Sequence, residues 1–424
     1  MHGRLVKLCG VDVHGYAAHH SATGAQGRGA WNFADRPGRA LFRILLVSLV
    51  VALIVGCQPP QVPQYEATPS PSAFRVAYID DKSLNMMHVD GTEVTPLAHD
   101  LQPTECAPYY VSPNGQWIAY QQADDGLWIA PTQGGSPSTL TGAMAGSVSW
   151  FPDSSGVVYT LEDGVYAQWL DSSQPRRPLA SGGRRYLFPT WSPDGKYIAF
   201  LETTAIPHVF NAIIIQSDGT GWRTLGTTAP EPSEEQRLCP DIVAWSPDST
   251  RFLVDFGDPA FAFYVAGGSP VQMGAGRAPT HHAWSSDGRN LTYQDEEDRL
   301  WLAKADGSGH KLLTDFSVSE AVWSPHNSQV AYISQRDGDS DLEVMDTETN
   351  ETRSLTGADN YLESNPSWTP DGLFLIFARH VLEEDTSSEV KRVSAGIWHV
   401  PADGSTPPQR LALTGDSPRV FAIR

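Results

Sequence analysis

The segment WSPDGKYIAF, residues 191–200, has near copies along the same chain, and this repetition decides the fold. The copies are WSPDSTRFLV from Trp245, WSSDGRNLTY from Trp284, WSPHNSQVAY from Trp323 and WTPDGLFLIF from Trp368, with weaker versions from Trp150 and Val111. Consecutive copies start 39, 41, 54, 39, 39 and 45 residues apart. A chain that repeats itself at such a period is an array of one structural unit.

Each copy is predicted to contain four short strands. In the quoted unit, Trp191 ends the first strand and residues 192–195, Ser-Pro-Asp-Gly, form a turn. Proline presets φ there, aspartate bonds the local backbone and glycine accepts positive φ. The apolar segments KYIAFLE and NAIIIQ follow as the second and third strands, Asp218-Gly219 marks a hairpin, and WRTLG is the fourth strand. The nearly continuous apolar character of the middle strands indicates sheets covered on both faces.

A period of roughly 40 residues with four strands per repeat predicts an all-β, single closed β-propeller of four-stranded blades. Seven copies and one shared blade make eight blades; seven is the alternative, because the copy at Trp150 is degenerate. FRVAYIDD, from Phe74, begins the shared blade, and SPRVFAIR, residues 417–424, supplies its missing strand. Such pairing of the N- and C-terminal strands removes exposed sheet edges.

The Trp-Ser-Pro-Asp-Gly turn, the Ile-Ala-Phe strand and the Asp-Gly hairpin before Leu-Thr resemble the repeat of TolB-type propellers. Residues 334–346, SQRDGDSDLEVMD, match that repeat best. The resemblance runs from Phe74 to the end of the chain and implies the fold rather than a function, because one fold hosts many sites. TolB itself carries an α/β domain ahead of its propeller, for which residues 58–73 leave no room. The partners of TolB therefore do not carry over.

The N-terminal region is predicted to be a targeting sequence. RILLVSLVVALIVGC, residues 43–57, holds an apolar run that suits a signal peptide better than a membrane span. Arg39 and Arg43 supply its positive flank. The run ends in Ile-Val-Gly-Cys, which resembles a bacterial lipobox and implies lipidation of Cys57. An ordinary signal peptide or a short anchor helix, with a chance cysteine, is the alternative.

The predicted organisation is an N-terminal extension with a lipoprotein signal peptide (1–57), a Pro- and Ser-rich tether (58–73) and a propeller (74–424). A lipid anchor would hold the protein at a bacterial membrane, on the periplasmic or cell-surface side. The net charge is −20, from 29 basic and 49 acidic residues. Nucleic acid is excluded as an expected partner, because phosphate binding needs clustered Lys and Arg.

The sequence leaves open whether Cys106 and Cys239 form a disulfide, although the expected compartment is oxidising. The two residues precede the first strands of the second and fifth blades. Those blades lie far apart on a ring, whereas a disulfide needs Cα atoms within about 7 Å. The insertion TTAPEPSEEQRLCP, residues 227–240, is what could bring Cys239 across. No cysteine spacing predicts zinc.

The repeated residues are interpreted as structural. The tryptophans are expected to pack between blades, because aromatic side chains bury large areas. The segment RDGDSDLE, residues 336–343, imitates a calcium loop but lacks glycine at its sixth position, so a hairpin is expected there. The recurring aspartates are expected to cap turns: they are Asp153, Asp194, Asp248, Asp287 and Asp371.

His281 and His282 precede Trp284, where a strand would face the central channel. They resemble the metal-binding histidines of some propeller-built pectin lyases, but no repeat-related histidine accompanies them, so no metal or other cofactor is assigned. Prolyl-peptidase-type hydrolases also carry a propeller, yet their catalysis needs a Gly-x-Ser-x-Gly elbow, which this sequence lacks.

The sequence therefore favours a membrane-tethered propeller that binds an envelope protein, peptide or glycan without catalysis. The alternative is a channel-sited enzyme, such as a metal-dependent polysaccharide lyase, that uses His281, His282 and acidic residues. Two segments depart from the repeat, residues 227–240 and residues 379–396, RHVLEEDTSSEVKRVSAG. We expect both to be loops, which on a rigid scaffold either carry function or are tolerated insertions.

Overall fold

Strands and turns make up the described part of the computed structural model. The structure describes residues 74–80, 82–99, 101, 109–122, 126–143, 145–171, 173–228, 243–255, 260–274, 280–326, 328–336, 339–357, 361–384, 390–412 and 420–423. Every described residue lies in one compact unit, Ala67–Arg424. The predictions for residues 1–73, Cys106 and Cys239 lie outside these ranges. Within them, no helix is long and apolar enough to cross a membrane.

The repeat quoted above folds into one antiparallel sheet. Its strands are β12 (Tyr186–Trp191), β13 (Tyr197–Thr203), β14 (Phe210–Gln216) and β15 (Arg223–Thr228), paired in this order. Gly195 turns the chain between β12 and β13 with φ of 72°, and Gly219 turns it between β14 and β15 with φ of 83°. Glycine adopts this left-handed backbone without steric cost. The four strands predicted for this unit are confirmed.

Four other sheets repeat this antiparallel order. They comprise β1 (Arg75–Asp80), β2 (Ser83–His88) and β3 (Thr95–Ala98) with β31 (Val420–Ile423); β4 (Tyr109–Val111), β5 (Trp117–Gln122), β6 (Gly126–Pro131) and β7 (Ser138–Thr141); β8 (Val148–Trp150), β9 (Gly156–Leu161), β10 (Gly164–Trp169) and β11 (Arg177–Ser181); and β16 (Val243–Trp245), β17 (Arg251–Val254), β18 (Ala260–Tyr264) and β19 (Val271–Met273).

An eleven-stranded sheet contains three more groups of four. They are β20 (Thr280–Trp284), β21 (Asn290–Gln294), β22 (Arg299–Lys304) and the start of β23 (Lys311–Trp323); the end of β23 with β24 (Gln329–Arg336), β25 (Asp339–Asp346) and β26 (Thr352–Ser354); and β27 (Leu362–Trp368), β28 (Phe374–Glu384), β29 (Val390–Pro401) and β30 (Gln409–Ala412). Strand β23 serves two groups, because Lys311 pairs with β22 and Trp323 pairs with β24. We call each group of four a blade.

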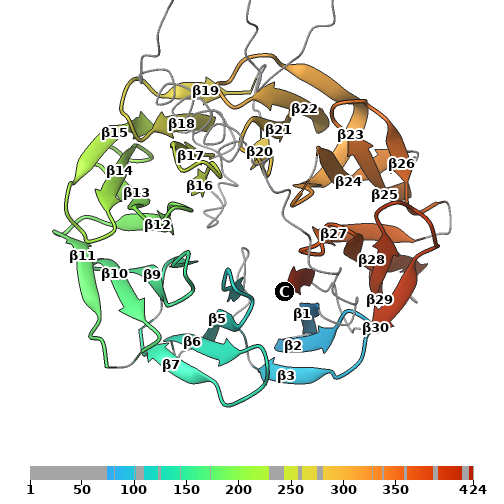
Figure 1. Ribbon diagram of the computed structural model, residues 1–424, viewed down its shortest axis with the longest axis horizontal. Helices are drawn as coiled ribbons and strands as arrows, with labels where there is room; N and C mark the ends of the chain where they lie inside the picture. Colours follow the sequence, from blue (N-terminus) through green and yellow to red (C-terminus); the bar gives the residue numbers. More distant parts are fainter. Residues whose placement is uncertain are drawn as a thin grey trace, which may run out of the picture. The chain divides into compact units, whose positions relative to one another are not determined.

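The blades follow one another in chain order, and the two ends of the propeller segment share one of them. Figure 1 shows β12, β16, β20 and β27 toward the middle of this unit and β7, β11, β15 and β30 at its outside. Strand β31 pairs with β1, with Arg75 opposite Ile423 and Tyr78 opposite Val420. This is the pairing predicted for the terminal segments. The grouping of the described strands favours eight blades over seven.

Neighbouring blades are held together by apolar side chains on both faces of each sheet. On β14, Ile214 packs in a buried cluster with Trp245 and Phe252 of the next blade. The adjacent residue Ile213 faces the other way, in a cluster with Val158 of the preceding blade. Successive residues of a strand point to opposite faces, so each middle strand feeds two interfaces. The prediction that these sheets are covered on both faces is confirmed.

The repeated tryptophans also tie each blade to the one before it by a hydrogen bond. In each case the indole Nε1–H donates to a backbone carbonyl in the first strand of the preceding blade. The bonds join Trp150 to Tyr110 (2.9 Å), Trp245 to Thr190 (3.0 Å), Trp284 to Ala244 (3.3 Å), Trp323 to Ala283 (3.1 Å) and Trp368 to Val322 (3.1 Å). The tryptophans therefore pack between blades, as predicted.

Trp191 is the exception. Its Nε1 is buried and has no hydrogen-bond partner among the described residues. The preceding blade carries Phe151 where its relatives have serine or threonine, and the two rings lie with centroids 4.7 Å apart. At this interface an aromatic contact therefore replaces the indole–carbonyl bond. The sequence difference behind it is Phe151, which belongs to the degenerate copy that begins at Trp150.

The segment 379–396 is not the loop that was expected. Strands β28 and β29 continue through most of it, with His380 opposite Ser394 and Glu384 opposite Val390. The backbone N–H and C=O groups of both strands continue the ladder beyond the core of the blade, although residues 379–384, RHVLEE, do not alternate apolar and polar side chains. Residues 385–389 and 229–242 lie outside the described ranges.

The indole–carbonyl bond can be tested with a matched pair of substitutions. Trp245→Phe removes the donor and leaves the Thr190 carbonyl without it, whereas Trp191→Phe removes a donor that has no acceptor. We expect Trp245→Phe to lower the free energy of unfolding by about 1 kcal/mol more than Trp191→Phe does, measured by urea denaturation. Equal losses for the two variants would contradict this role.

Candidate functional site

His281 and His282 lie next to each other in β20, but their surroundings differ. The pairing of β20 with β21 shifts register between Thr280 and Ala283, which marks a β-bulge. His281 is exposed and has φ of 52°. The side chain of His282 is fully buried: its Nδ1 lies 2.7 Å from Oδ2 of Asp255. The two histidines therefore do not form one site.

The strained backbone at His281 is a feature of the repeat rather than of a special site. Phe188, Glu320 and Asn365 have φ between 53° and 54° and stand, like His281, three residues before a repeated tryptophan. Two of these positions are also linked across an interface, because the Asn365 N–H donates to Oε2 of Glu320. A conformation that recurs in four blades reports on blade packing, whereas a single outlier would suggest function.

No metal centre forms around these histidines in the described residues, where no three His, Cys, Asp or Glu side chains gather closely enough to hold an ion. The calcium-like segment 336–343 spans the hairpin of β24 and β25, with Arg336 opposite Asp339. Arg336 also pairs with the buried Glu343. The hairpin predicted for this segment is confirmed.

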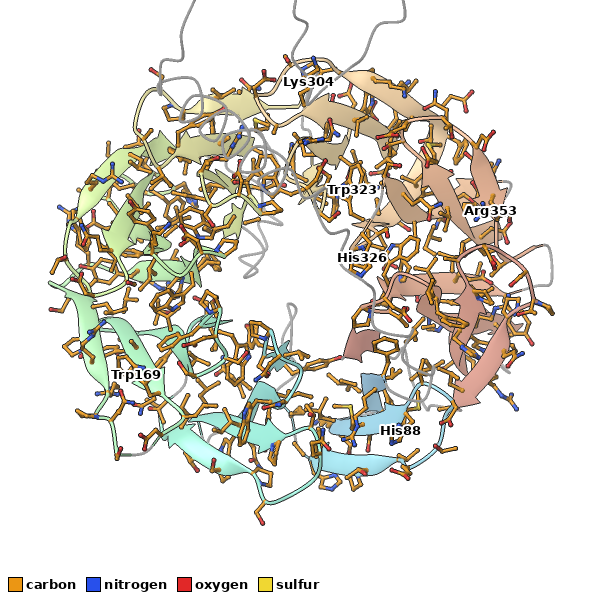
Figure 2. All side chains as sticks on the ribbon, viewed as in Figure 1. His88, Trp169, Lys304, Trp323, His326 and Arg353 are labelled. Carbon is orange, nitrogen blue, oxygen red and sulfur yellow. The ribbon has the colours of Figure 1, made fainter. Side chains whose placement is uncertain are left out.

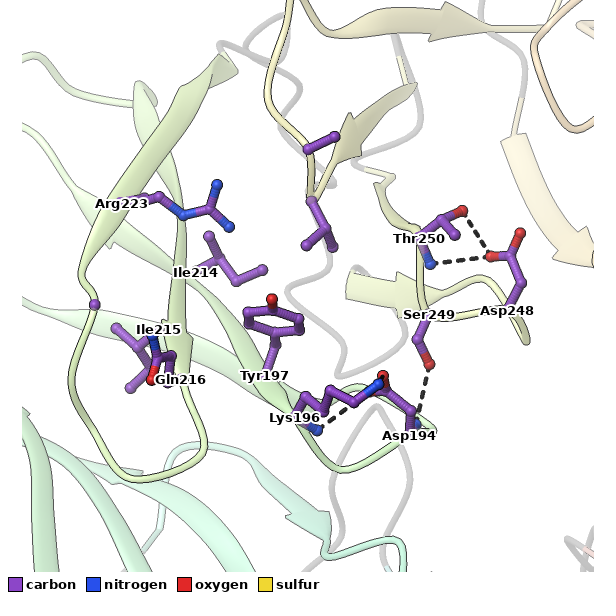
Figure 3. A pocket seen from close by; sticks show the side chains of 13 residues that line it. Asp194, Lys196, Tyr197, Ile214, Ile215, Gln216, Arg223, Asp248, Ser249 and Thr250 are labelled. Atoms are coloured by element: carbon purple, nitrogen blue, oxygen red, sulfur yellow. Dashed lines mark hydrogen bonds and ion pairs between the residues drawn. The ribbon is translucent and has the colours of Figure 1, made fainter.

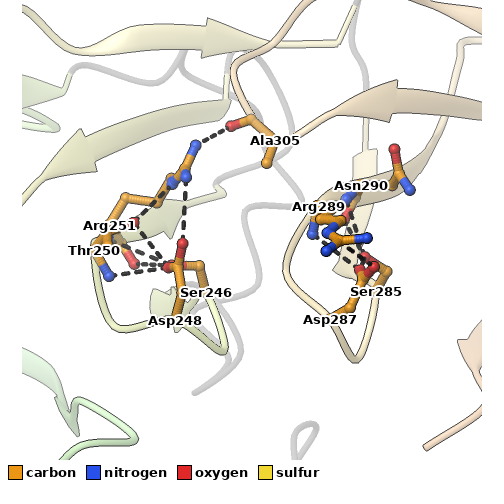
Figure 4. A network of polar contacts seen from close by, with 9 residues as sticks. All are labelled: Ser246, Asp248, Thr250, Arg251, Ser285, Asp287, Arg289, Asn290 and Ala305. Atoms are coloured by element: carbon orange, nitrogen blue, oxygen red, sulfur yellow. Dashed lines mark hydrogen bonds and ion pairs between the residues drawn. The ribbon is translucent and has the colours of Figure 1, made fainter. Parts of the chain in front are cut away.

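The recurring aspartates cap the turns between first and second strands. Ser285 Oγ donates to Oδ1 of Asp287 at 2.7 Å, and the Arg289 N–H donates to the same oxygen at 3.0 Å (Figure 4). Equivalent bonds surround Asp194, Asp248 and Asp371, and a backbone N–H bond also reaches Asp153. The turn-capping interpretation is confirmed.

The cavity that we take as the candidate site lies between the β12–β15 blade and the β16–β19 blade. It has a volume of about 600 Å³. Residues of both blades line it, among them Tyr197, Gln216 and Arg223 on one side and Asp248 and Val265 on the other (Figure 3). Pockets of this size commonly hold small ligands.

Charged groups at the rim of this cavity are mostly paired. Lys196 Nζ lies 2.8 Å from Oδ2 of Asp194, and Asp248 lies 3.5 Å from the guanidinium of Arg251. Burial opposes ionisation of Asp194, but hydrogen bonds from Lys196 and Ser192 outweigh it and lower its pKa. Both partners of the Lys196–Asp194 pair are therefore charged at neutral pH.

Three polar groups in the cavity are available to a ligand. The Tyr197 hydroxyl, the Gln216 amide nitrogen and the Arg223 guanidinium line it and make no hydrogen bond within the described ranges. Figure 3 shows Tyr197 and Arg223 projecting toward the same space. The repeated tryptophans and aspartates did not indicate this site, and the sequence signal that could have done so is the basic residue that begins several fourth strands.

No family model matches the chain. An uncharacterized protein of Agrobacterium fabrum is 23% identical over an alignment of 265 residues, and the match covers 45% of this chain and 84% of that protein. The structure of dihydro-heme d1 dehydrogenase NirN has a TM-score of 0.52 at 14% identity and covers 83% of this chain and 78% of its own. This likeness shows the fold alone.

TolB structures are also among the matches. A putative TolB from Agrobacterium tumefaciens has a TM-score of 0.35 at 17% identity, over 59% of this chain and 94% of its own. TolB from Acinetobacter baumannii has a TM-score of 0.35 at 16% identity, over 84% of this chain and 68% of its own. The four-stranded sheets described above establish the β-propeller fold of this chain, whereas its ligand must be inferred from the site.

The turn aspartates predict how stability depends on pH. The hydrogen bond from Ser285 is the main cause that lowers the pKa of Asp287 in the folded protein. Ionised Asp287 therefore stabilises the fold above its unfolded-chain pKa, and this contribution disappears as the pH falls through the folded pKa.

Asp287→Asn provides the test. An asparagine oxygen accepts the same bonds, as Asn114 does from Ser112 and Gln116, but it does not titrate. We expect the variant to flatten the decline in unfolding free energy between about pH 6 and about pH 3, measured by urea denaturation. A decline as steep as that of the wild type would refute the assignment.

Proposed function

We propose that this chain is an extracytoplasmic, lipid-anchored β-propeller that binds a protein, peptide or glycan of the cell envelope and releases it unchanged. The observation that supports binding is the cavity between the β12–β15 and β16–β19 blades. Its Tyr197, Gln216 and Arg223 side chains present hydrogen-bond donors that no described protein group occupies. Unoccupied donors in a concave site are suited to hold a polar ligand.

The surrounding contacts favour a rigid binding frame. Neighbouring blades are joined by buried apolar clusters and by indole–carbonyl bonds, such as that from Trp245 to Thr190 at the same interface as the cavity. A site held by rigid elements loses little entropy when a ligand binds. This supports recognition by a preformed surface.

The lyase alternative receives less support. It requires His281 and His282 to meet a substrate together, yet the side chain of His282 is fully buried and bonded to Asp255. A polymer could reach that ring only after the interface around Tyr293, which stacks on it, had opened. Buried residues of this kind usually serve packing.

The anchor is tested by changing Cys57. Cys57→Ser removes the thiol that would carry the lipid, so we expect the variant to move from the membrane pellet to the soluble fraction after ultracentrifugation. Cys106→Ser is the matched control and should remain in the pellet. A Cys57→Ser protein that still sediments with membranes after an alkaline wash would disprove lipid anchoring at this residue.

Binding without catalysis is tested on the purified full-length protein. Envelope protein, peptide and glycan fractions are passed over the immobilised protein, and retained material is eluted and weighed by mass spectrometry. We expect saturable, reversible retention of a component with unchanged mass. Retention of none of the fractions would refute the binding function, and shortened or unsaturated products would identify an enzyme instead.

A further inference from the structure

Besides the indole bond, a second contact links neighbouring blades and recurs around the described unit. A basic side chain donates to the carbonyl of the residue that directly follows the third strand of the next blade. The pairs are Arg75–Thr132 (2.5 Å), Arg177–Ser217 (2.8 Å), Arg251–Ala305 (2.6 Å), Lys311–Thr347 (3.1 Å) and Arg353–Ala402 (2.7 Å). Figure 2 shows Trp323 toward the middle and Arg353 toward the outside, so the two kinds of bond tie blades at different radii.

The basic residue occupies one of two equivalent positions. Arg75 and Arg251 begin the second strand of their blades. Arg177, Lys311 and Arg353 lie on fourth strands, each opposite the residue two before the end of the third strand, namely Ala167, Leu302 and Val344. The position is thus defined by register and not by sequence similarity alone.

Three interfaces lack this cation–carbonyl bond within the described ranges. In two of them neither position holds a cation: Trp117 and Ser138 occupy one pair of positions, and Phe374 and Gln409 occupy the other. The third is the interface of the candidate site. There Arg223 stands opposite Ile214, which is the same register as in the bonded cases.

Arg223 thus occupies the position from which other basic residues bond to the next blade, but it makes no cation–carbonyl bond among the described residues. The equivalent acceptor is the carbonyl of Val265, the residue that follows β18, and the structure gives no bond between the two. The hairpin after Val265 also departs from the Asp-Gly pattern, with Gly267 and Gly268 at φ of 88° and 117°. Both linking positions of this blade, Tyr197 and Arg223, line the cavity instead.

The charges around Arg223 define the ligand it suits. Lys196 is paired with Asp194, and Asp248 lies beside Arg251. Burial opposes ionisation of Asp248, but hydrogen bonds from Ser246 and Thr250 prevail and lower its pKa, so both aspartates are negative at neutral pH. Because Asp194 and Asp248 each have a cation partner, Arg223 leaves one uncompensated positive charge in the lining of the cavity. One such charge matches a monoanion better than a phosphate dianion, and a guanidinium binds a carboxylate with two parallel bonds.

We infer that the cavity binds the carboxylate of an acidic sugar, with Arg223 as the anion ligand and Tyr197 and Gln216 as partners for sugar hydroxyls. This rests on the proposed function and names its ligand class. A volume of about 600 Å³ exceeds what one acidic side chain of a peptide fills, and a sugar ring supplies the hydroxyl groups that the neutral donors need.

The test compares Arg223→Gln with Arg353→Gln by isothermal titration calorimetry of tri-galacturonate on the full-length protein. Arg223→Gln should weaken binding about tenfold or more, because it removes a charge-assisted hydrogen bond, and should leave the midpoint of urea unfolding unchanged. Arg353→Gln breaks a bond between blades, so it should lower that midpoint and bind as the wild type does.

Ligand controls separate the possible sources of the carboxylate. The methyl ester of tri-galacturonate keeps the sugar and removes the charge, so it should bind no better to the wild type than to Arg223→Gln. If tri-galacturonate does not bind but tri-glutamate does, and its binding depends on Arg223, the assignment to a sugar is wrong. Equal destabilisation by the two substitutions would show that Arg223 links blades.

The outcome is distinguishable from failure of the proposed function. If an envelope component is retained by both the wild type and Arg223→Gln while tri-galacturonate does not bind, the protein is a binding protein whose site lies elsewhere, and this inference is wrong. If nothing is retained at all, the proposed function is wrong as well.

Discussion

The interface between neighbouring blades is the constraint on which the rest of the structure depends. A four-stranded sheet with two apolar faces cannot remain in water, so each face must be covered by another blade. Apolar packing supplies the attraction but not the alignment. The indole–carbonyl bond from Trp245 to Thr190, and its counterparts in other blades, fixes how far each first strand slides past its neighbour, because a partly buried carbonyl has few other partners.

Because these contacts recur, the places where they fail are informative. At the interface of Trp191, Phe151 replaces the polar residue of the turn and ring packing stands where a hydrogen bond is made elsewhere, which preserves burial. At the interface of Arg223, the cation–carbonyl bond is missing among the described residues, and the two blades enclose a cavity that Tyr197 and Arg223 line. The first departure is compensated within the core. The second leaves donors facing a cavity, and departures of that kind are where function is expected.

The acidic balance of the whole protein and the cation in its cavity fit together. A net charge of −20 disfavours the general approach of anions, so an anionic ligand must be recognised by a local arrangement of groups. Arg223 provides one, and the charges of Lys196 and Asp194, which line the same cavity, balance each other. Because Lys196 is already paired with Asp194, the site suits a ligand that brings one negative charge. The charge of the ligand then contributes to selectivity as well as its shape.

The sequence by itself determined the repeated unit: the strands around Trp191, the Asp194 turn cap, the role of the tryptophans and the pairing of the terminal segments follow from local periodicity and turn chemistry. It could not place His282 against Asp255, extend β28 and β29 through residues 379–396, or reveal the cavity of Arg223. Those features depend on which residues of different blades meet. A basic residue at the start of a fourth strand looks the same in the sequence wherever it occurs. Only the position of the carbonyl in the next blade decides whether that residue joins two blades or faces a cavity.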